Sequence, residues 1–271
     1  MRMGMILNLY HPNPMKPHKF IAKALSTLLA SSILLALASP ALSHERRFAF
    51  TYETTVAEPG TIEYEQWVTW KAHKGSNRDF QRFEFREELE FGVTDRLQLG
   101  LYLADWRLTN GTDDDGAEFR TSGIEAIYQL TDPTKAPFGS ALYGEALLGP
   151  EKFALEGKLL LQKNLGPLVI AYNAVLEAEW EGSGYDERVG VWENTLGLSY
   201  QISPQLLVGI EATHEVEFED WSEAGDHVFY VGPNMSFRKG NFYATLAPLF
   251  QVSGLDDEPD FMTRLIVGFT F

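Results

Sequence analysis

Alternation of apolar and polar residues with a period of two constrains the fold of this chain more than any other feature. The pattern is clearest over residues 260–271, where Leu265, Val267, Phe269 and Phe271 occupy alternate positions. Because successive side chains of a β-strand point to opposite faces, this stretch predicts a strand with one apolar face. Much of the rest of the chain repeats the pattern, so the prediction extends beyond one isolated strand.

Eleven earlier segments show the same alternation, which gives twelve predicted strands in all. They span ten to fifteen residues each, about the length that a tilted strand needs to cross a bilayer. No stretch after residue 43 shows the 3.6-residue periodicity of an amphipathic helix. We therefore predict an all-β fold, a twelve-stranded antiparallel up-and-down transmembrane β-barrel over residues 61–271. The earlier segments are 61–71, 80–93, 96–108, 117–130, 140–149, 151–164, 167–181, 188–202, 205–218, 227–238 and 240–252.

The connections between these segments also alternate, between tight turns and longer polar loops. The tight turns are at 94–95, 165–167, 203–204 and 239–240, and the longer loops are at 73–79, 110–116, 182–187, 219–226 and 253–260. Two connections break the rule, because 131–139 is long where a turn is due and 149–150 is short where a loop is due. Tight turns at one end and longer loops at the other are typical of outer-membrane barrels. We expect the turns and both ends of the barrel chain to face the periplasm.

The first 43 residues are predicted to be a cleaved signal peptide and not part of the fold. Lys16, Lys19 and Lys23 form a basic region before the apolar run 24–38, and small residues follow at the expected cleavage position near Ser43. Residues 44–60 then form an N-terminal segment of their own. This segment is expected either to pack under the periplasmic rim or to enter the lumen as a small plug.

One face of most segments is apolar, and the other carries the charged residues. Leu99, Ile170 and Val208 lie on the apolar face, and Glu88 and Glu211 lie on the charged one. A soluble lipocalin-like barrel buries its apolar face, whereas a transmembrane barrel turns that face toward lipid. Periodicity alone leaves both orientations open. The signal peptide, the loop asymmetry and the aromatic residues near both strand ends favour the transmembrane orientation.

Two stretches carry a resemblance to a known family. Residues 48–67 combine an alternating run with the turn Glu58-Pro59-Gly60, and residues 91–100 read Phe-Gly-Val-Thr-Asp-Arg-Leu-Gln-Leu-Gly. Both stretches resemble uncharacterised bacterial outer-membrane β-barrel proteins related to the transporter-like family of the meta-cleavage phenol degradation pathway. The resemblance implies a barrel in the outer membrane of a bacterial cell and a transport role. It supplies no catalytic residues.

An inward-facing charged face would line the lumen of the barrel. Because a low-dielectric wall focuses the field of one sign, an acidic lumen favours cationic or neutral solutes. We predict a passive pore or transporter for small solutes. A closed structural barrel without a channel is the alternative, since twelve strands leave a lumen between the filled interior of eight and the wide channel of sixteen. The residues predicted to line the lumen are Glu84, Arg86, Glu88, Glu125, Glu145, Glu177, Glu193, Glu211, Glu215 and Arg264.

No catalytic, cofactor or metal site is predicted. The acidic clusters at 113–115 and 256–258 lack the spacing of an EF-hand loop. The absence of cysteine excludes disulfides, thiol nucleophiles and cysteine-ligated zinc. An outer-membrane hydrolase is a further alternative, and it would need a serine beside His73, His214 or His227. No Gly-x-Ser-x-Gly motif is present.

The net charge limits the classes of partner that we expect. The first 43 residues carry four basic and no acidic residues, so the remaining chain has 18 basic and 38 acidic residues, a net charge of −20. Nucleic acid requires a basic surface and is therefore not an expected partner. We expect outer-membrane lipid and lipopolysaccharide around the barrel and a small-molecule solute inside it. The barrel assembly machinery is expected to read the C-terminal strand that ends at Phe271.

Overall fold

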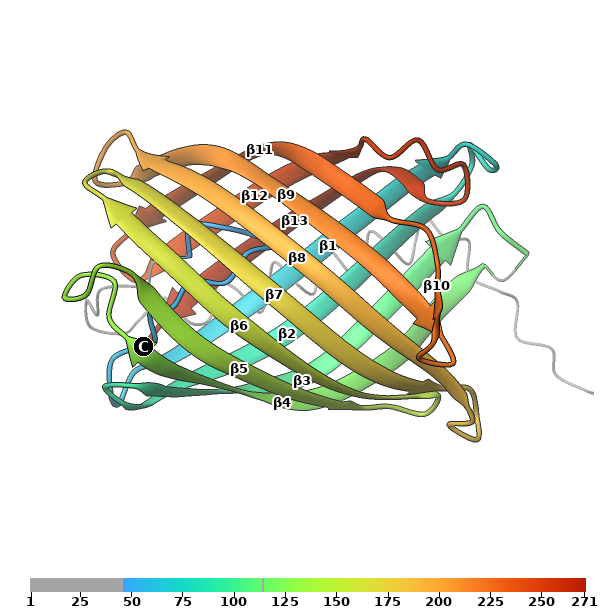
Figure 1. Ribbon diagram of the computed structural model, residues 1–271, viewed down its shortest axis with the longest axis horizontal. Helices are drawn as coiled ribbons and strands as arrows, with labels where there is room; N and C mark the ends of the chain where they lie inside the picture. Colours follow the sequence, from blue (N-terminus) through green and yellow to red (C-terminus); the bar gives the residue numbers. More distant parts are fainter. Residues whose placement is uncertain (1–45, 114) are drawn as a thin grey trace, which may run out of the picture. The chain divides into compact units, whose positions relative to one another are not determined.

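Twelve long strands close into an antiparallel barrel in the computed structural model, which describes residues 46–113 and 115–271 (Figure 1). The predicted signal peptide at 1–43 lies outside the described residues. No helix among the described residues is long and apolar enough to cross a membrane. The long strands are β1 (Ile62–Lys74), β2 (Gln81–Thr94), β3 (Leu97–Asn110), β4 (Gly116–Thr131), β5 (Gly139–Leu148), β6 (Lys152–Leu165), β7 (Leu168–Glu181), β8 (Glu187–Gln201), β9 (Leu206–Glu219), β11 (Val228–Lys239), β12 (Phe242–Gln251) and β13 (Pro259–Thr270).

The strand order is up and down, with one closing pair. Each long strand pairs antiparallel with the long strands before and after it, and β1 pairs with β13 from Glu63↔Thr270 to Lys74↔Pro259. Each predicted segment matches one long strand to within three residues at either end. A thirteenth strand, β10 (Glu223–Ala224), is a two-residue addition to the end of β9 in a loop. The predicted twelve-stranded barrel is confirmed.

The apolar face of the barrel points outward and the charged face points inward. Leu99 and Leu176 are 41% and 69% exposed on the outside. Glu88 and Glu211 are fully buried on the inside. This is the orientation that distinguishes a transmembrane barrel from a soluble one, because only lipid would cover such an outer surface favourably. The soluble lipocalin-like alternative is thereby set aside.

Both irregular connections have the lengths that the sequence predicts. Residues 132–138 join β4 to β5, and residues 149–151 join β5 to β6. The longer one is organised by Asp132, whose carboxylate accepts hydrogen bonds from the Thr134 hydroxyl at 2.6 Å and backbone amide at 2.8 Å and pairs with Lys135 at 2.8 Å. The hydrogen bond from Lys135, together with those from Thr134, lowers the pKa of Asp132 to about 2. The segment is therefore an ordered turn.

A charged residue placed on the apolar outer surface of the barrel should reveal whether lipid covers that surface. Leu196 is 43% exposed near the middle of β8, and Leu165 is 50% exposed beside the tight turn after β6. Leu196→Arg is expected to lower the free energy of unfolding by about 2–4 kcal/mol, and Leu165→Arg by about 1 kcal/mol or less. Denaturant titration in phospholipid vesicles measures both values. Equal, small effects would contradict a lipid-covered belt.

Candidate functional site

The N-terminal segment 46–57, here called the plug, lies inside the barrel at the end where the tight turns are. Its main anchor is Glu211 on β9. The backbone amides of Ala49, Phe50 and Thr51 donate hydrogen bonds to this carboxylate at 2.8, 2.7 and 3.0 Å. Phe48 is fully buried beside the wall. A carboxylate that accepts three amides is a strong anchor, because hydrogen bonds to charged groups are the stronger ones.

Amide side chains of the wall bind the rest of the plug. Asn173 accepts a hydrogen bond from the Tyr52 amide at 2.7 Å and donates one to the Tyr52 carbonyl at 3.0 Å. Gln162 accepts from the Thr54 amide, and Gln98 accepts from the Ala57 amide, both at 2.8 Å. Because buried backbone groups need partners, these side chains replace the neighbouring strand that the plug lacks.

Between the plug and the strand ends beside the longer loops lies a cavity of about 540 Å³, here called the vestibule. Phe50, Tyr52 and Trp67 line its plug end, and Lys74 and Glu258 line its loop end. Between the plug and the barrel wall, a separate space of about 20 Å³ adjoins Glu90. The plug therefore bounds the vestibule at the end of the barrel where the tight turns are.

The ten residues predicted to line the lumen divide into two groups. Glu84, Arg86, Glu145, Glu177, Glu193, Glu215 and Arg264 line the vestibule. Glu88, Glu125 and Glu211 face inward but are at most 2% exposed, at the level of the plug. The first group can meet a solute in this arrangement, whereas the second is covered.

The wall of the vestibule is balanced in charge. Nine basic and nine acidic side chains line it, so the acidic surplus predicted for the lumen is not found here. The basic residues are Lys71, Lys74, Arg82, Arg86, Arg107, Arg120, Lys152, Lys158 and Arg264, and the acidic ones are Glu84, Asp105, Glu145, Glu156, Glu177, Glu193, Glu215, Glu217 and Glu258.

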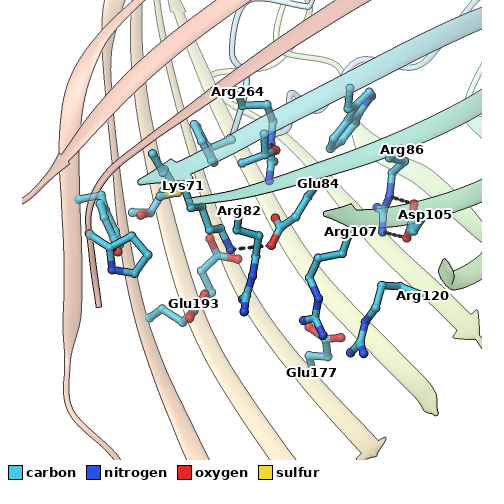
Figure 2. A pocket seen from close by; sticks show the side chains of 18 of the residues that line it. Lys71, Arg82, Glu84, Arg86, Asp105, Arg107, Arg120, Glu177, Glu193 and Arg264 are labelled. Atoms are coloured by element: carbon cyan, nitrogen blue, oxygen red, sulfur yellow. Dashed lines mark hydrogen bonds and ion pairs between the residues drawn. The ribbon is translucent and has the colours of Figure 1, made fainter. Parts of the chain in front are cut away.

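Basic and acidic side chains alternate along much of this wall, as Lys71 pairs with Glu84 at 3.2 Å and Lys152 with Glu177 at 3.7 Å. Figure 2 shows Arg82, Arg107 and Arg120 projecting from β2, β3 and β4, with Glu177 and Glu193 on β7 and β8. Arg107 pairs with Glu118, and Arg120 pairs with Glu181 at 3.3 Å. Arg82, Glu193 and Glu215 form no ion pair within 4.0 Å among the described residues. The charges that form no ion pair contribute to the electric field inside the vestibule.

Several vestibule residues were missed by the sequence analysis because the strands are irregular. The pairing of β3 with β4 shifts register between Tyr102 and Asp105. Leu99 and Leu101 point outward, but after the shift Asp105 and Arg107, at the same parity, line the vestibule. Such a bulge inserts an extra residue and reverses the faces beyond it. In the sequence, the change from leucine at 99 and 101 to charged residues at 105 and 107 could have indicated this shift.

The histidines do not form a serine hydrolase site in the described part of the chain. His214 and His227 are stacked, with Nε2 of His214 2.9 Å from Nδ1 of His227. Nδ1 of His214 lies 3.1 Å from Nδ2 of Asn194. His73 Nδ1 meets the Arg78 carbonyl at 2.7 Å. Within residues 46–113 and 115–271, no hydrogen bond joins any of these histidines to a serine.

The acidic loops do not bring three carboxylates together in the described residues. Asp115 accepts a hydrogen bond from the Thr112 amide at 2.8 Å, and the Asp256 carbonyl accepts one from Ser76 at 2.9 Å. The groupings of carboxylate oxygens close enough for a cation lie instead inside the barrel, among Glu63, Glu65, Glu88, Glu90 and Glu125.

Comparison with known structures identifies similar barrels. The chain is similar to an outer membrane channel, COG4313, from Pseudomonas putida F1, with a TM-score of 0.57 and 14% identity over 80% of this chain and 98% of that one. It is also similar to the NanC porin, with a TM-score of 0.52 and 11% identity over 75% and 98% of the two chains. The translocator domain of the autotransporter NalP from Neisseria meningitidis aligns with a TM-score of 0.50 and 12% identity over 94% and 97%.

At these identities the likeness shows the fold alone, a barrel of the outer-membrane type. Comparison with curated protein sequences gives no match. The relation to the phenol-pathway transporter-like family stays a prediction. Residues 40–263 match the model of a family of unknown function, DUF6662. Because that match spans most of the chain, the protein belongs to this family.

Proposed function

We propose that the protein is a gated passive pore for small solutes in the bacterial outer membrane and not an enzyme. The observation that carries the proposal is the polar vestibule of about 540 Å³, which ends at the plug. A structural barrel needs no such space, since side chains alone can fill it. The similar outer membrane channel and porin share the fold and support a transport role.

The plug is the gate. It is attached through hydrogen bonds from wall side chains and does not pair as a strand in the sheet. Displacing it therefore breaks side-chain contacts and leaves the ring of strand pairs intact. Segments that order and detach in this way are a known class of switching element. The plugged arrangement is the low-conductance state.

The charge balance of the vestibule sets the preferred solute. Arg82 lies on one part of the wall, and Glu193 and Glu215 lie on another. A solute with separated positive and negative groups can satisfy both parts, whereas a simple cation or anion is repelled by one of them. Small zwitterionic or dipolar solutes are therefore preferred over the cationic or neutral solutes expected from an acidic lumen.

Location and partners complete the proposal. The outward leucines and the exposed Tyr128, Tyr200 and Trp192 near the strand ends match an apolar belt with aromatic borders. Outer-membrane lipid and lipopolysaccharide surround this belt. The barrel assembly machinery reads the last strand, whose Phe271 amide donates to the Ile62 carbonyl at 2.8 Å next to the closing pair.

A reversible cross-link between plug and wall should control conductance. Thr54→Cys combined with Gly139→Cys suits this test, because position 139 lies directly against the Thr54 side chain, which has to rotate to make room for the new Cβ, and the chain has no other cysteine. In planar bilayers the oxidised protein is expected to stay in its low-conductance state. Adding a thiol reductant should restore opening steps.

Two controls accompany the cross-link. Each single cysteine variant should respond to neither oxidant nor reductant. A chain without residues 46–57, refolded in the same detergent, should conduct constantly. If removing the plug leaves conductance unchanged or absent, the plug is not a gate and the closed structural barrel is the better reading.

Ion selectivity should respond in opposite directions to the two parts of the wall. Arg82→Gln removes a positive charge and is expected to shift the reversal potential in a salt gradient toward cation preference. Glu193→Gln with Glu215→Gln should shift it toward anions. The reversal potential of the wild-type open pore should lie between the values of these variants. Strong cation preference in the wild type would restore the original expectation of an acidic filter.

A further inference from the structure

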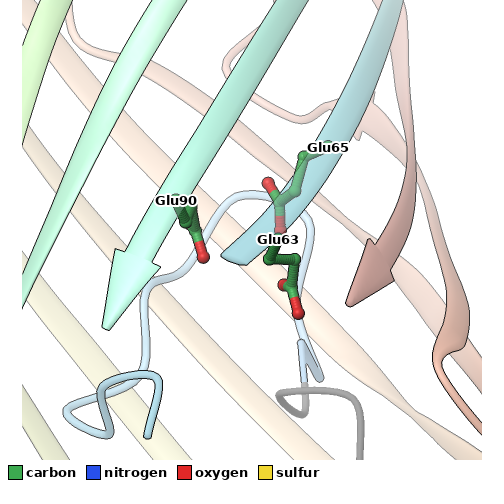
Figure 3. A group of neighbouring side chains, drawn as sticks. All are labelled: Glu63, Glu65 and Glu90. Carbon is green, nitrogen blue, oxygen red and sulfur yellow. The ribbon is translucent and has the colours of Figure 1, made fainter. Parts of the chain in front are cut away.

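At the level of the plug, five buried glutamates lie close together. Glu63, Glu65, Glu88, Glu90 and Glu125 are at most 2% exposed, and they come from β1, β2 and β4. Figure 3 shows Glu63 and Glu65 on β1 beside Glu90 on β2. A buried carboxylate is expensive unless it is paired, protonated or bound to a metal. Each member therefore requires a compensating group.

Protein groups satisfy two of the five. Glu63 accepts hydrogen bonds from the hydroxyls of Tyr243 at 2.8 Å and Thr270 at 2.6 Å. Glu65 accepts one from Trp67 Nε1 at 2.5 Å and pairs with Arg46 of the plug at 3.1 Å. These two carboxylates need no further ligand.

The other three keep unused oxygens. Both carboxylate oxygens of Glu88, one of Glu90 and one of Glu125 accept no hydrogen bond and are shielded from solvent. Arg46 reaches Glu90 at 3.7 Å, and the Tyr102 hydroxyl donates to the other oxygen of Glu125. Four buried acceptor atoms without a donor, close to one another, point to a missing positive ligand.

The spacing of these oxygens suits a hard cation. One oxygen each from Glu88, Glu90 and Glu125 lie within 4.8 Å of one another. Oxygens bound to one Ca²⁺ at about 2.3–2.6 Å can be separated by up to about 5 Å, whereas the shorter bonds to Mg²⁺ draw them closer. Calcium is therefore the better match among the two common divalent cations.

The sequence beside Glu88 and Glu125 agrees with a ligand, and a small space adjoins the third carboxylate, Glu90. Gly100 on β3 faces Glu88 and Glu125, and a Cβ there would lie 2.6 Å from a Glu88 oxygen and 2.3 Å from Glu125 Cγ. The neighbouring space of about 20 Å³ adjoins Glu90 and Gln98, and about 10–15 Å³ is enough for one small occupant. The missing side chain is what lets the two carboxylates approach.

We propose that Glu88, Glu90 and Glu125 bind a calcium ion inside the barrel at the level of the plug. Three carboxylates supply the negative charge that hard cations prefer, and the unused oxygens of Glu88 allow bidentate coordination. The site does not depend on the transport role, because none of its ligands lines the vestibule. Protonation of the same glutamates is the competing way to neutralise them.

Terbium luminescence tests the site directly in the folded protein in detergent micelles. Tyr102 is hydrogen-bonded to Glu125 and is placed to sensitise a bound lanthanide. Wild-type protein should show saturable Tb³⁺ emission that Ca²⁺ displaces. Glu88→Gln should weaken Ca²⁺ competition by at least about tenfold, since even outer-shell partners of metal ligands have effects of that size. Absence of saturable emission in the wild type overturns the proposal in favour of protonation.

Matched variants separate this site from other acids. Gly100→Ala keeps every carboxylate but fills the space between Glu88 and Glu125, so it should also weaken Ca²⁺ binding. Glu187→Gln on an exposed strand end should leave binding unchanged. Retention of folding in each variant is checked by gel electrophoresis, in which an unheated folded barrel migrates faster than the same protein after heating. If binding survives both Glu88→Gln and Gly100→Ala, or disappears with Asp256→Asn and Asp257→Asn in the outer loop, the ion is not held by the glutamates.

Discussion

Closure of the sheet, where β1 pairs with β13, is the constraint on which the rest of the structure depends. Within a bilayer no water is present to satisfy an exposed strand edge, so each backbone group must find its partner in a neighbouring strand. The pairing from Glu63↔Thr270 to Lys74↔Pro259 removes both edges at once. Closure also creates an enclosed axis and turns alternate residues toward it. The interior of this protein is therefore built from its polar residues.

A polar interior has to be filled and neutralised by other means than an apolar core. Side chains of the wall bind the backbone of the plug, most clearly Glu211 with the amides of Ala49, Phe50 and Thr51. Elsewhere ion pairs bridge neighbouring strands, as Arg86 does with Asp105 at 2.8 Å. Where neither applies, as at Glu88, the structure leaves acceptors for a bound ion. The plug, the ion pairs and the proposed calcium ion each provide partners for buried polar and charged groups, at different depths in the barrel.

The position of the plug divides the charged residues of the lumen into two groups. Residues on the loop side of the plug, such as Arg82 and Glu193, line the vestibule, where we propose that they act on a solute. Residues at its level, such as Glu125, are buried and contact other protein groups. Net charge of the whole chain mixes both groups, which is why it overstates the acidity that a solute meets. The distinction rests on where one short segment lies.

The sequence by itself determined the twelve strands and their lengths. It also determined at which end of the barrel each connection lies and, for most residues, on which face of the strand the side chain lies. Alternation with period two is a local property, and every strand repeats it, so a single chain suffices to read it. Only the tertiary structure decided where that rule breaks, as in the shift that brings Asp105 and Arg107 inward. It also decided that the plug enters the lumen and which amides of the wall hold it. Most of those contacts join residues more than 100 positions apart, such as Tyr52 and Asn173, and no local pattern specifies such a pair.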